Sequence, residues 1–208
     1  MPSSYASPCS ALLLFLLILS GGISGNPGDG HWIKVHFLHG SKPKHAFRHT
    51  EPKYLGGLHG GHVSIQFDSV DVGFETNGRV HLLPHPHHPD GLFKVKLVKG
   101  ADPYPDSARL TTVHILLPDS TYDRMKRLLY DYAAHTPYDY AFLGMRCASA
   151  TQDILARLQV LPKKRRMNNI LTTFYPRKLR RRVLKMAADK NYRVVRRDGR
   201  RSRIWEKD

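Results

Sequence analysis

The sequence predicts an α+β fold, in which helices pack on an antiparallel sheet of about five or six strands. Roughly the first half of its 208 residues contains short runs with the two-residue alternation of strands that have one buried face, such as HVSIQF (62–67) and VDVGFE (70–75). The second half contains longer runs with apolar residues at helical spacing. Strands followed by helices along one chain are typical of the α+β class.

The strand-like runs are rich in β-branched and aromatic residues and are separated by segments rich in Gly and Pro. Strands are expected at 32–38, 62–67, 70–75, 92–98 and 110–117. The TNG turn at 76–78 predicts a hairpin between VDVGFE and RVHLL. The segments YRVV and RIWE, on either side of Asp198-Gly199, predict a second hairpin at the end of the chain.

Three helices are expected in the second half. Asp119 or Ser120 would cap the first helix, whose apolar face is formed by Tyr122, Met125, Leu128, Leu129 and Tyr132. The second helix begins at or near Cys147. The third follows Pro176, because the fixed φ of proline suits the first turn of a helix.

The first 24 residues read as a secretory signal peptide. An uninterrupted apolar run, ALLLFLLIL (11–19), is followed by the small-residue patch SGGISG. The run is shorter than the roughly 20 apolar residues of a membrane-spanning helix, and a signal anchor through residues 11–25 is the alternative. We therefore expect a secreted or periplasmic protein with one compact domain after the leader.

Positive charge is concentrated at the C-terminal end. Residues 161–208 contain 18 Lys or Arg against 4 Asp or Glu, so they carry +14 of the formal net charge of +16. Such a segment attracts polyanions, and we expect an anionic cell-envelope polymer or a membrane surface as partner through residues 163–207. Nucleic acid is disfavoured for an exported protein. A simple solvated face is the alternative.

Cys147 is the residue that suggests chemistry. The other cysteine, Cys9, lies in the expected leader, so the mature chain has a single thiol without a disulfide partner. A thiol at a helix N-terminus faces unpaired N–H groups, which predicts a lowered pKa. His62, at the start of a strand, is a reasonable base for it. The alternative is a cysteine that packs in the core as a small hydrophobe.

A group of histidines is a weaker candidate for a functional site, in this case a metal site. The imidazoles that could ligate a metal are His81, His85, His87 and His88. The prolines at 84, 86 and 89 make the segment stiff and extended, and no Cys or carboxylate spacing completes a familiar site. We expect neither a metal nor a cofactor. The glycines at 56, 57, 60 and 61 are not a dinucleotide-binding loop, because no helix pattern follows them.

The order of these residues resembles a known superfamily. His62 in GGHVSIQF, Glu75 in VDVGFE, the segment PYDY (137–140) and Cys147-Ala148-Ser149 follow one another as in the circularly permuted branch of the NlpC-like papain superfamily. That branch includes bacterial amidase-like proteins and relatives of lecithin:retinol acyltransferase, and in it the His strand precedes the Cys helix. The resemblance covers roughly residues 60–160.

The resemblance implies a permuted papain-like catalytic domain at 25–160 and a basic extension, a helix and a hairpin, at 161–208. The activity implied is that of a cysteine hydrolase (peptidase or amidase) or acyltransferase, acting on an amide, ester or thioester of a peptide or lipid. Cys147 would be the nucleophile and His62 the base. Either Glu75 or His81 would orient His62.

Three further points complete the expectation. Tyr138 or Tyr140 would line the substrate cleft. Arg146 stands where some relatives carry Asn or Tyr. The alternative function is a non-catalytic module that binds an anionic polymer or membrane surface through the basic C-terminal segment, since related folds also serve without catalysis.

Overall fold

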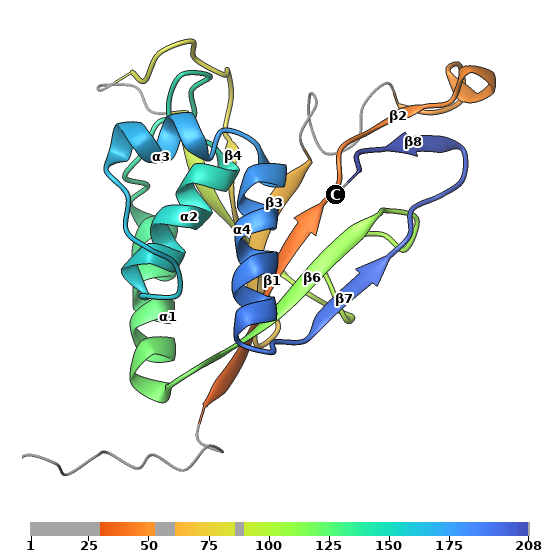
Figure 1. Cartoon of the computed structure of the whole chain (residues 1–208). Helices are drawn as coiled ribbons and strands as arrows, with labels where there is room; N and C mark the ends of the chain where they lie inside the picture. Colours follow the sequence, from red (N-terminus) through yellow and green to blue (C-terminus); the bar gives the residue numbers. More distant parts are fainter. Residues whose placement is uncertain (1–29, 53–60, 86–89, 208) are drawn as a thin grey trace, which may run out of the picture.

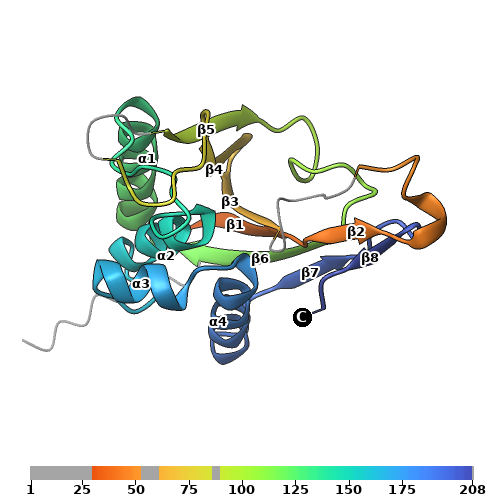
Figure 2. The same ribbon diagram turned by 90° about the horizontal axis from the view of Figure 1, so that it is seen from above.

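The computed structural model describes residues 30–52, 61–85 and 90–207, and it confirms the α+β class (Figure 1). Six strands form one antiparallel sheet in the order β5-β4-β3-β1-β6-β7, and two short strands form a separate pair, β2 and β8. The helices lie on one face of the large sheet, which is seen most clearly from above (Figure 2). Within the described ranges no helix combines the length and the apolar character needed to cross a membrane.

The elements follow one another along the chain with strands first and helices later. The strands are β1 His31–Leu38, β2 Ser41–Pro43, β3 His62–Phe67, β4 Val70–Thr76, β5 Gly91–Leu97, β6 Leu110–Leu117, β7 Val194–Arg197 and β8 Arg203–Trp205. The helices are α1 Asp119–Ala134, α2 Cys147–Arg157, α3 Arg166–Thr172 and α4 Pro176–Asp189, with a 3-10 turn at His45–Phe47. Helices beginning at 119, 147 and 176 are as predicted, although Pro118 rather than Asp119 or Ser120 is the N-cap of α1.

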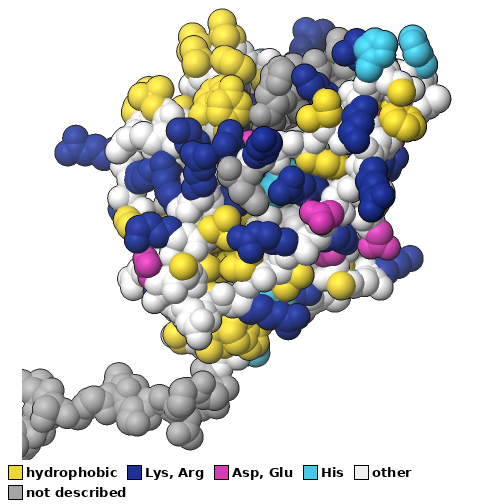
Figure 3. Space-filling model, turned by 45° about the vertical axis from the view of Figure 1, so that its right-hand side comes forward, with side chains coloured by type: hydrophobic (Ala, Val, Ile, Leu, Met, Phe, Trp, Pro, Cys, Tyr) yellow, Lys and Arg dark blue, Asp and Glu magenta, His cyan; other side chains and the backbone are white. Residues whose placement is uncertain are grey.

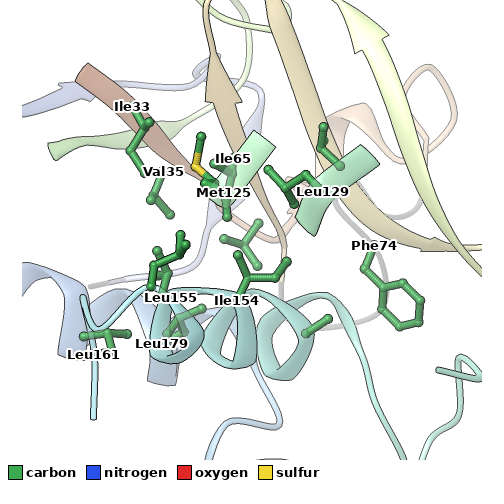
Figure 4. Packing of buried hydrophobic residues seen from close by; sticks show 14 of the residues in the cluster. Ile33, Val35, Ile65, Phe74, Met125, Leu129, Ile154, Leu155, Leu161 and Leu179 are labelled. Carbon is green, nitrogen blue, oxygen red and sulfur yellow. The ribbon is translucent and has the colours of Figure 1, made fainter. Parts of the chain in front are cut away.

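One face of the sheet forms the apolar core with the helices. Alternate residues of β3, Val63, Ile65 and Phe67, are almost fully buried on this face. Figure 4 shows how Ile65 packs with residues of β1 and of the helices, among them Met125, Leu129, Ile154, Leu155 and Leu179. The alternation that predicted β3 therefore marks the side on which α2 packs.

The opposite face of the sheet is also covered, but it is polar. His36 bonds through Nδ1 to Thr112 Oγ1 at 2.9 Å and through Nε2 to Gln66 Oε1 at 2.8 Å. Ser64 bonds to the hydroxyl of Tyr104 at 3.0 Å, and Tyr104 belongs to the loop between β5 and β6. Ser64 and Gln66, polar residues of the alternating run of β3, are thus buried and hydrogen-bonded rather than solvated. His62 belongs to this face, at the start of β3.

The basic C-terminal residues belong to the same core and sheet. Leu179, Val183 and Ala187 of α4 are fully buried against the sheet. The expected hairpin between YRVV and RIWE is wrong, because β7 pairs with β6 and β8 pairs with β2. As the edge strand of the six-stranded sheet, β7 joins a packed structure, whereas an isolated two-stranded hairpin is only marginally stable in water.

The hairpin expected around TNG is also wrong, because β4 pairs with β5 and the segment RVHLL forms no strand. His81 makes a single bridge to Ala141, and the N–H of Asn77 donates to the carbonyl of Asp90 at 2.7 Å. The turn after β4 is therefore a long loop that returns along residues 140–143. The short helix α3, which was not predicted, lies between α2 and α4.

Candidate active site

Cys147 is the first residue of α2 and is buried, with 5% of its surface exposed. The helix begins here because Arg146 has an extended backbone and donates its N–H to Ser149 Oγ at 2.8 Å. The N–H groups of Val63 and Ala148 and the hydroxyl of Tyr140 lie near the sulfur and favour its thiolate form. The β3–β4 ladder ends at Ser64 and Gly73, so Val63 has no ladder partner on β4.

Burial raises the pKa of the Cys147 thiol. The charge of Arg146, the two N–H groups and the Tyr140 hydroxyl act in the opposite direction but do not outweigh it. The expectation that the helix N-terminus lowers this pKa is therefore wrong, because the desolvation of a buried thiolate is the larger effect. The thiol is protonated at neutral pH and needs a base to act as a nucleophile.

His62 lies at the start of β3 and faces Glu75, with Nε2 at 3.9 Å from Glu75 Oε1. Its ring rests on Gly73, where an added Cβ would stand 2.7 Å from Nε2. Nε2 is buried and has no hydrogen-bond partner among the described residues, so it makes no hydrogen bond to Cys147. Burial lowers the pKa of His62 to about 4, with Glu75 raising it and Lys96 lowering it. His62 is therefore neutral at pH 7.

Glu75 is held as a carboxylate by two lysines of β5. Lys96 Nζ lies 2.5 Å from Oε1 and Lys94 Nζ lies 3.9 Å from Oε2. Burial alone would raise the pKa of Glu75, but the hydrogen bond and charge of Lys96, with the charges of His62 and Lys94, hold it below its usual value. The negative charge therefore stands opposite His62 at neutral pH.

His81, the other residue expected to orient His62, is engaged elsewhere. Its Nδ1 bonds to Asp139 Oδ2 at 2.7 Å, and its Nε2 lies 3.3 Å from Asp90 Oδ2. Asp139 also accepts the N–H groups of His85 and Asp90, each at 2.7 Å. With both ring nitrogens facing carboxylates, His81 closes the loop after β4, and Glu75 is the group that faces His62.

The two tyrosines expected at the substrate cleft have different surroundings. Tyr138 is buried, and its hydroxyl donates to Asp153 Oδ2 at 2.6 Å, so it lies with the middle of α2. Tyr140 is half-buried and lies near the Cys147 sulfur, and burial raises its pKa to about 12. Of the two, the structure brings Tyr140 to the thiol.

The sequence identifies Arg146 and Asp139 only as parts of motifs, without a role. The guanidinium of Arg146 lies 4.3 Å from the ring centre of Phe174, with Phe142 at 5.6 Å and Tyr175 at 5.8 Å. These rings come from segments about 30 residues apart, which no local pattern connects. Asp139 could have been found through PYDY, since an acidic residue between tyrosines is unusual in a buried segment.

The described residues contain no group of three His, Cys, Asp or Glu side chains arranged to hold a metal ion. Of the four histidines considered as ligands, His87 and His88 lie outside the described residues, as do Gly56, Gly57 and Gly60. His81 is bound to Asp139.

Comparisons with protein-family models, with curated proteins and with solved structures gave no match for this chain.

The backbone at position 61, directly before His62, requires a glycine. Its φ is +69°, and an added Cβ would stand 1.8 Å from the carbonyl oxygen of Leu38. We expect Gly61→Ala to lower the free energy of unfolding by about 2 kcal/mol or more, because the backbone must shift. Urea denaturation measures this. Gly100→Ala, where an added Cβ meets nothing within 4 Å, is the matched control, and equal stabilities of the two variants would contradict the expectation.

Proposed function

We propose that this protein is an exported cysteine hydrolase or acyltransferase that acts on an amide, ester or thioester and belongs to the permuted branch of the NlpC-like papain superfamily. One observation carries the proposal. The N-terminal part of α2 packs against β3, and the N–H of Val63, the residue that follows His62, lies near the sulfur of Cys147, so the start of α2 adjoins the strand end that bears the imidazole and its carboxylate.

The protonation states support general-base catalysis. Because the pKa of Cys147 is raised and that of His62 is lowered, the resting pair is a neutral thiol and a neutral imidazole. With Nε2 facing Glu75, the tautomer that carries its proton on Nε2 leaves the lone pair of Nδ1 to accept the thiol proton. His62 belongs to the polar face of the sheet in the resting enzyme, so its ring must turn past the end of β3 toward the sulfur when substrate binds.

In the first step, Nδ1 of His62 takes the thiol proton as the sulfur attacks the acyl carbonyl. Glu75 balances the imidazolium charge, and the unpaired N–H groups in the first turn of α2 bind the oxyanion of the tetrahedral intermediate. The imidazolium then returns the proton to the leaving group, and a thioester remains on Cys147. Water in a hydrolase, or an acceptor in a transferase, gives a proton to His62, attacks the thioester and releases the thiol.

The acyl-enzyme is the species that tests the proposal. Incubation with short-chain nitrophenyl esters should add one acyl group to Cys147, detected by intact-protein mass spectrometry and removed by hydroxylamine. Cys147→Ala should remain unmodified, and His62→Ala should be modified far more slowly. A native protein that gains no acyl group, while its urea-unfolded form reacts at the thiol, would show that Cys147 is only a packing residue.

A further inference from the structure

We propose that a rim of exposed apolar side chains beside the N-terminal end of α2 inserts into an anionic lipid bilayer and holds the Cys147 site at a membrane surface. The apolar rim consists of six residues, each 47–69% exposed: Val80, Leu82, Leu83, Phe142, Leu143 and Leu171. Scattered single apolar residues are normal on a protein surface, but a contiguous group marks a site of interaction.

The three segments that bear the rim lie side by side. The N–H of Leu143 donates to the carbonyl of Leu82 at 2.9 Å, which joins the loop after β4 to the segment before α2. The ring centres of Phe142 and Phe174 are 5.2 Å apart. Phe174 follows Leu171, near the end of α3, by three residues. Figure 1 places this loop and α3 at the upper end of the molecule, and Figure 3 shows apolar side chains gathered at that end.

The rim adjoins the candidate nucleophile. Phe142 and Leu143 precede Cys147 by four or five residues, and the guanidinium of Arg146 lies over the rings of Phe142 and Phe174. A surface that contacts the rim would therefore lie next to the N-terminal end of α2, where the thiol is placed.

Cations stand beside the rim without acidic neighbours in the sequence. Residues 154–188 contain 11 Lys or Arg and no Asp or Glu. Lys164 Nζ lies 2.7 Å from Thr172 Oγ1, and Arg182 Nη1 lies 2.6 Å from Thr173 Oγ1, so both charges flank the end of α3 that follows Leu171. Basic side chains around exposed apolar ones match the phosphates and acyl chains of an anionic bilayer. A soluble polyanion would use the cations alone and would leave the six apolar residues unexplained.

Tryptophan placed in the rim provides a local measurement of insertion. Leu82→Trp is made in the Cys147→Ala background of the full chain and mixed with phosphatidylcholine–phosphatidylglycerol vesicles whose acyl chains are brominated. We expect roughly half or more of the added fluorescence to be quenched, since interfacial insertion reaches about 5–10 Å into the acyl boundary. Leu97→Trp is the control, because Leu97 is 77% exposed on β5, outside the rim. The parent signal of Trp32 and Trp205 is subtracted.

Three outcomes would overturn the proposal. The first is quenching at position 82 that does not exceed that at position 97, even if the chain sediments with vesicles through residues 11–19. The second is equal quenching on phosphatidylcholine vesicles, which would remove the role of the anionic surface. The third is retention on heparin without quenching, which would indicate a soluble polyanion. Since the background lacks the thiol, quenching stands or fails independently of the acyl-enzyme experiment.

Discussion

Replacing His62 by alanine is expected to lower kcat/KM toward activated esters by about 10²–10⁴-fold, the range that positioned acid–base catalysis contributes. The effect is large because the Cys147 thiol has a raised pKa and cannot rely on its own ionisation. Glu75→Gln should cost less, since the imidazole remains but its imidazolium form loses the opposing charge. Steady-state kinetics with nitrophenyl esters measures both. The control is His135→Ala, a histidine whose side chain is 85% exposed at the end of α1.

The pH dependence separates this assignment from a general loss of structure. The active form requires neutral His62, whose pKa is about 4, so kcat/KM should stay level from neutral pH down to about pH 5 and fall below it. Glu75 raises that pKa, and Glu75→Gln should therefore move the acid limb to lower pH. Lys96 lowers the pKa of His62, so Lys96→Met should raise that pKa and move the acid limb to higher pH.

Two results would sink the assignment of His62. One is a His62→Ala variant with the kcat/KM of His135→Ala. The other is an acid limb near pH 6.5, the value of an ordinary histidine, that does not respond to Glu75→Gln.

The sequence predicts which residues share a face of the sheet but not what covers that face. The alternation in HVSIQF places His62, Ser64 and Gln66 together, as the structure confirms. It also suggests that these polar residues meet solvent, whereas Ser64 and Gln66 are buried with Tyr104 from a loop some 40 residues away. The covering of a sheet face by a distant loop depends on tertiary contacts, and the local alternation of polar and apolar residues does not predict it.

The same limit explains which parts of the candidate site were foreseen. Cys147 at a helix start and His62 at a strand start follow from local patterns, and both elements begin there. The predicted direction of the Cys147 pKa shift was wrong, because the N–H groups of a helix start can be predicted from the sequence but the burial of the thiol cannot. The pairing of strands was also not predictable from local patterns. The strand β7 is short and half-exposed, and its place beside β6 depends on the packing of α4 on the core.

Asp71→Asn is expected to stabilise the protein at neutral pH by about 2 kcal/mol and to have little effect near pH 4. Asp71 is 2% exposed on the polar face of the sheet, and its Oδ1 has no hydrogen-bond partner among the described residues. Burial raises its pKa to about 6, against the smaller lowering effects of the Ser64 hydrogen bond and the Lys96 charge. An asparagine has the same shape and no charge to desolvate.

The sign of the effect follows from the order in which the folded and unfolded chains lose this proton. Below about pH 4 both states hold it, and burying the carboxyl carries no electrostatic penalty. As the pH rises from about 4 to 6 the unfolded chain ionises first, so the free energy of unfolding falls, and above pH 6 the full penalty is present. The substitution Asp71→Asn would remove that penalty only where it exists.

Urea denaturation at pH 4 and at pH 7.5 gives the comparison, and the difference between variant and parent cancels the titration of all other groups. Asp123→Asn is the control, because the Asp123 side chain is 56% exposed on α1 and should change stability little at either pH. If Asp71→Asn instead destabilises the protein equally at both pH values, Asp71 is held as a carboxylate by the polar layer. The buried layer would then carry that negative charge at pH 4 as well as at pH 7.5, and burial would not be the main influence on the pKa of Asp71.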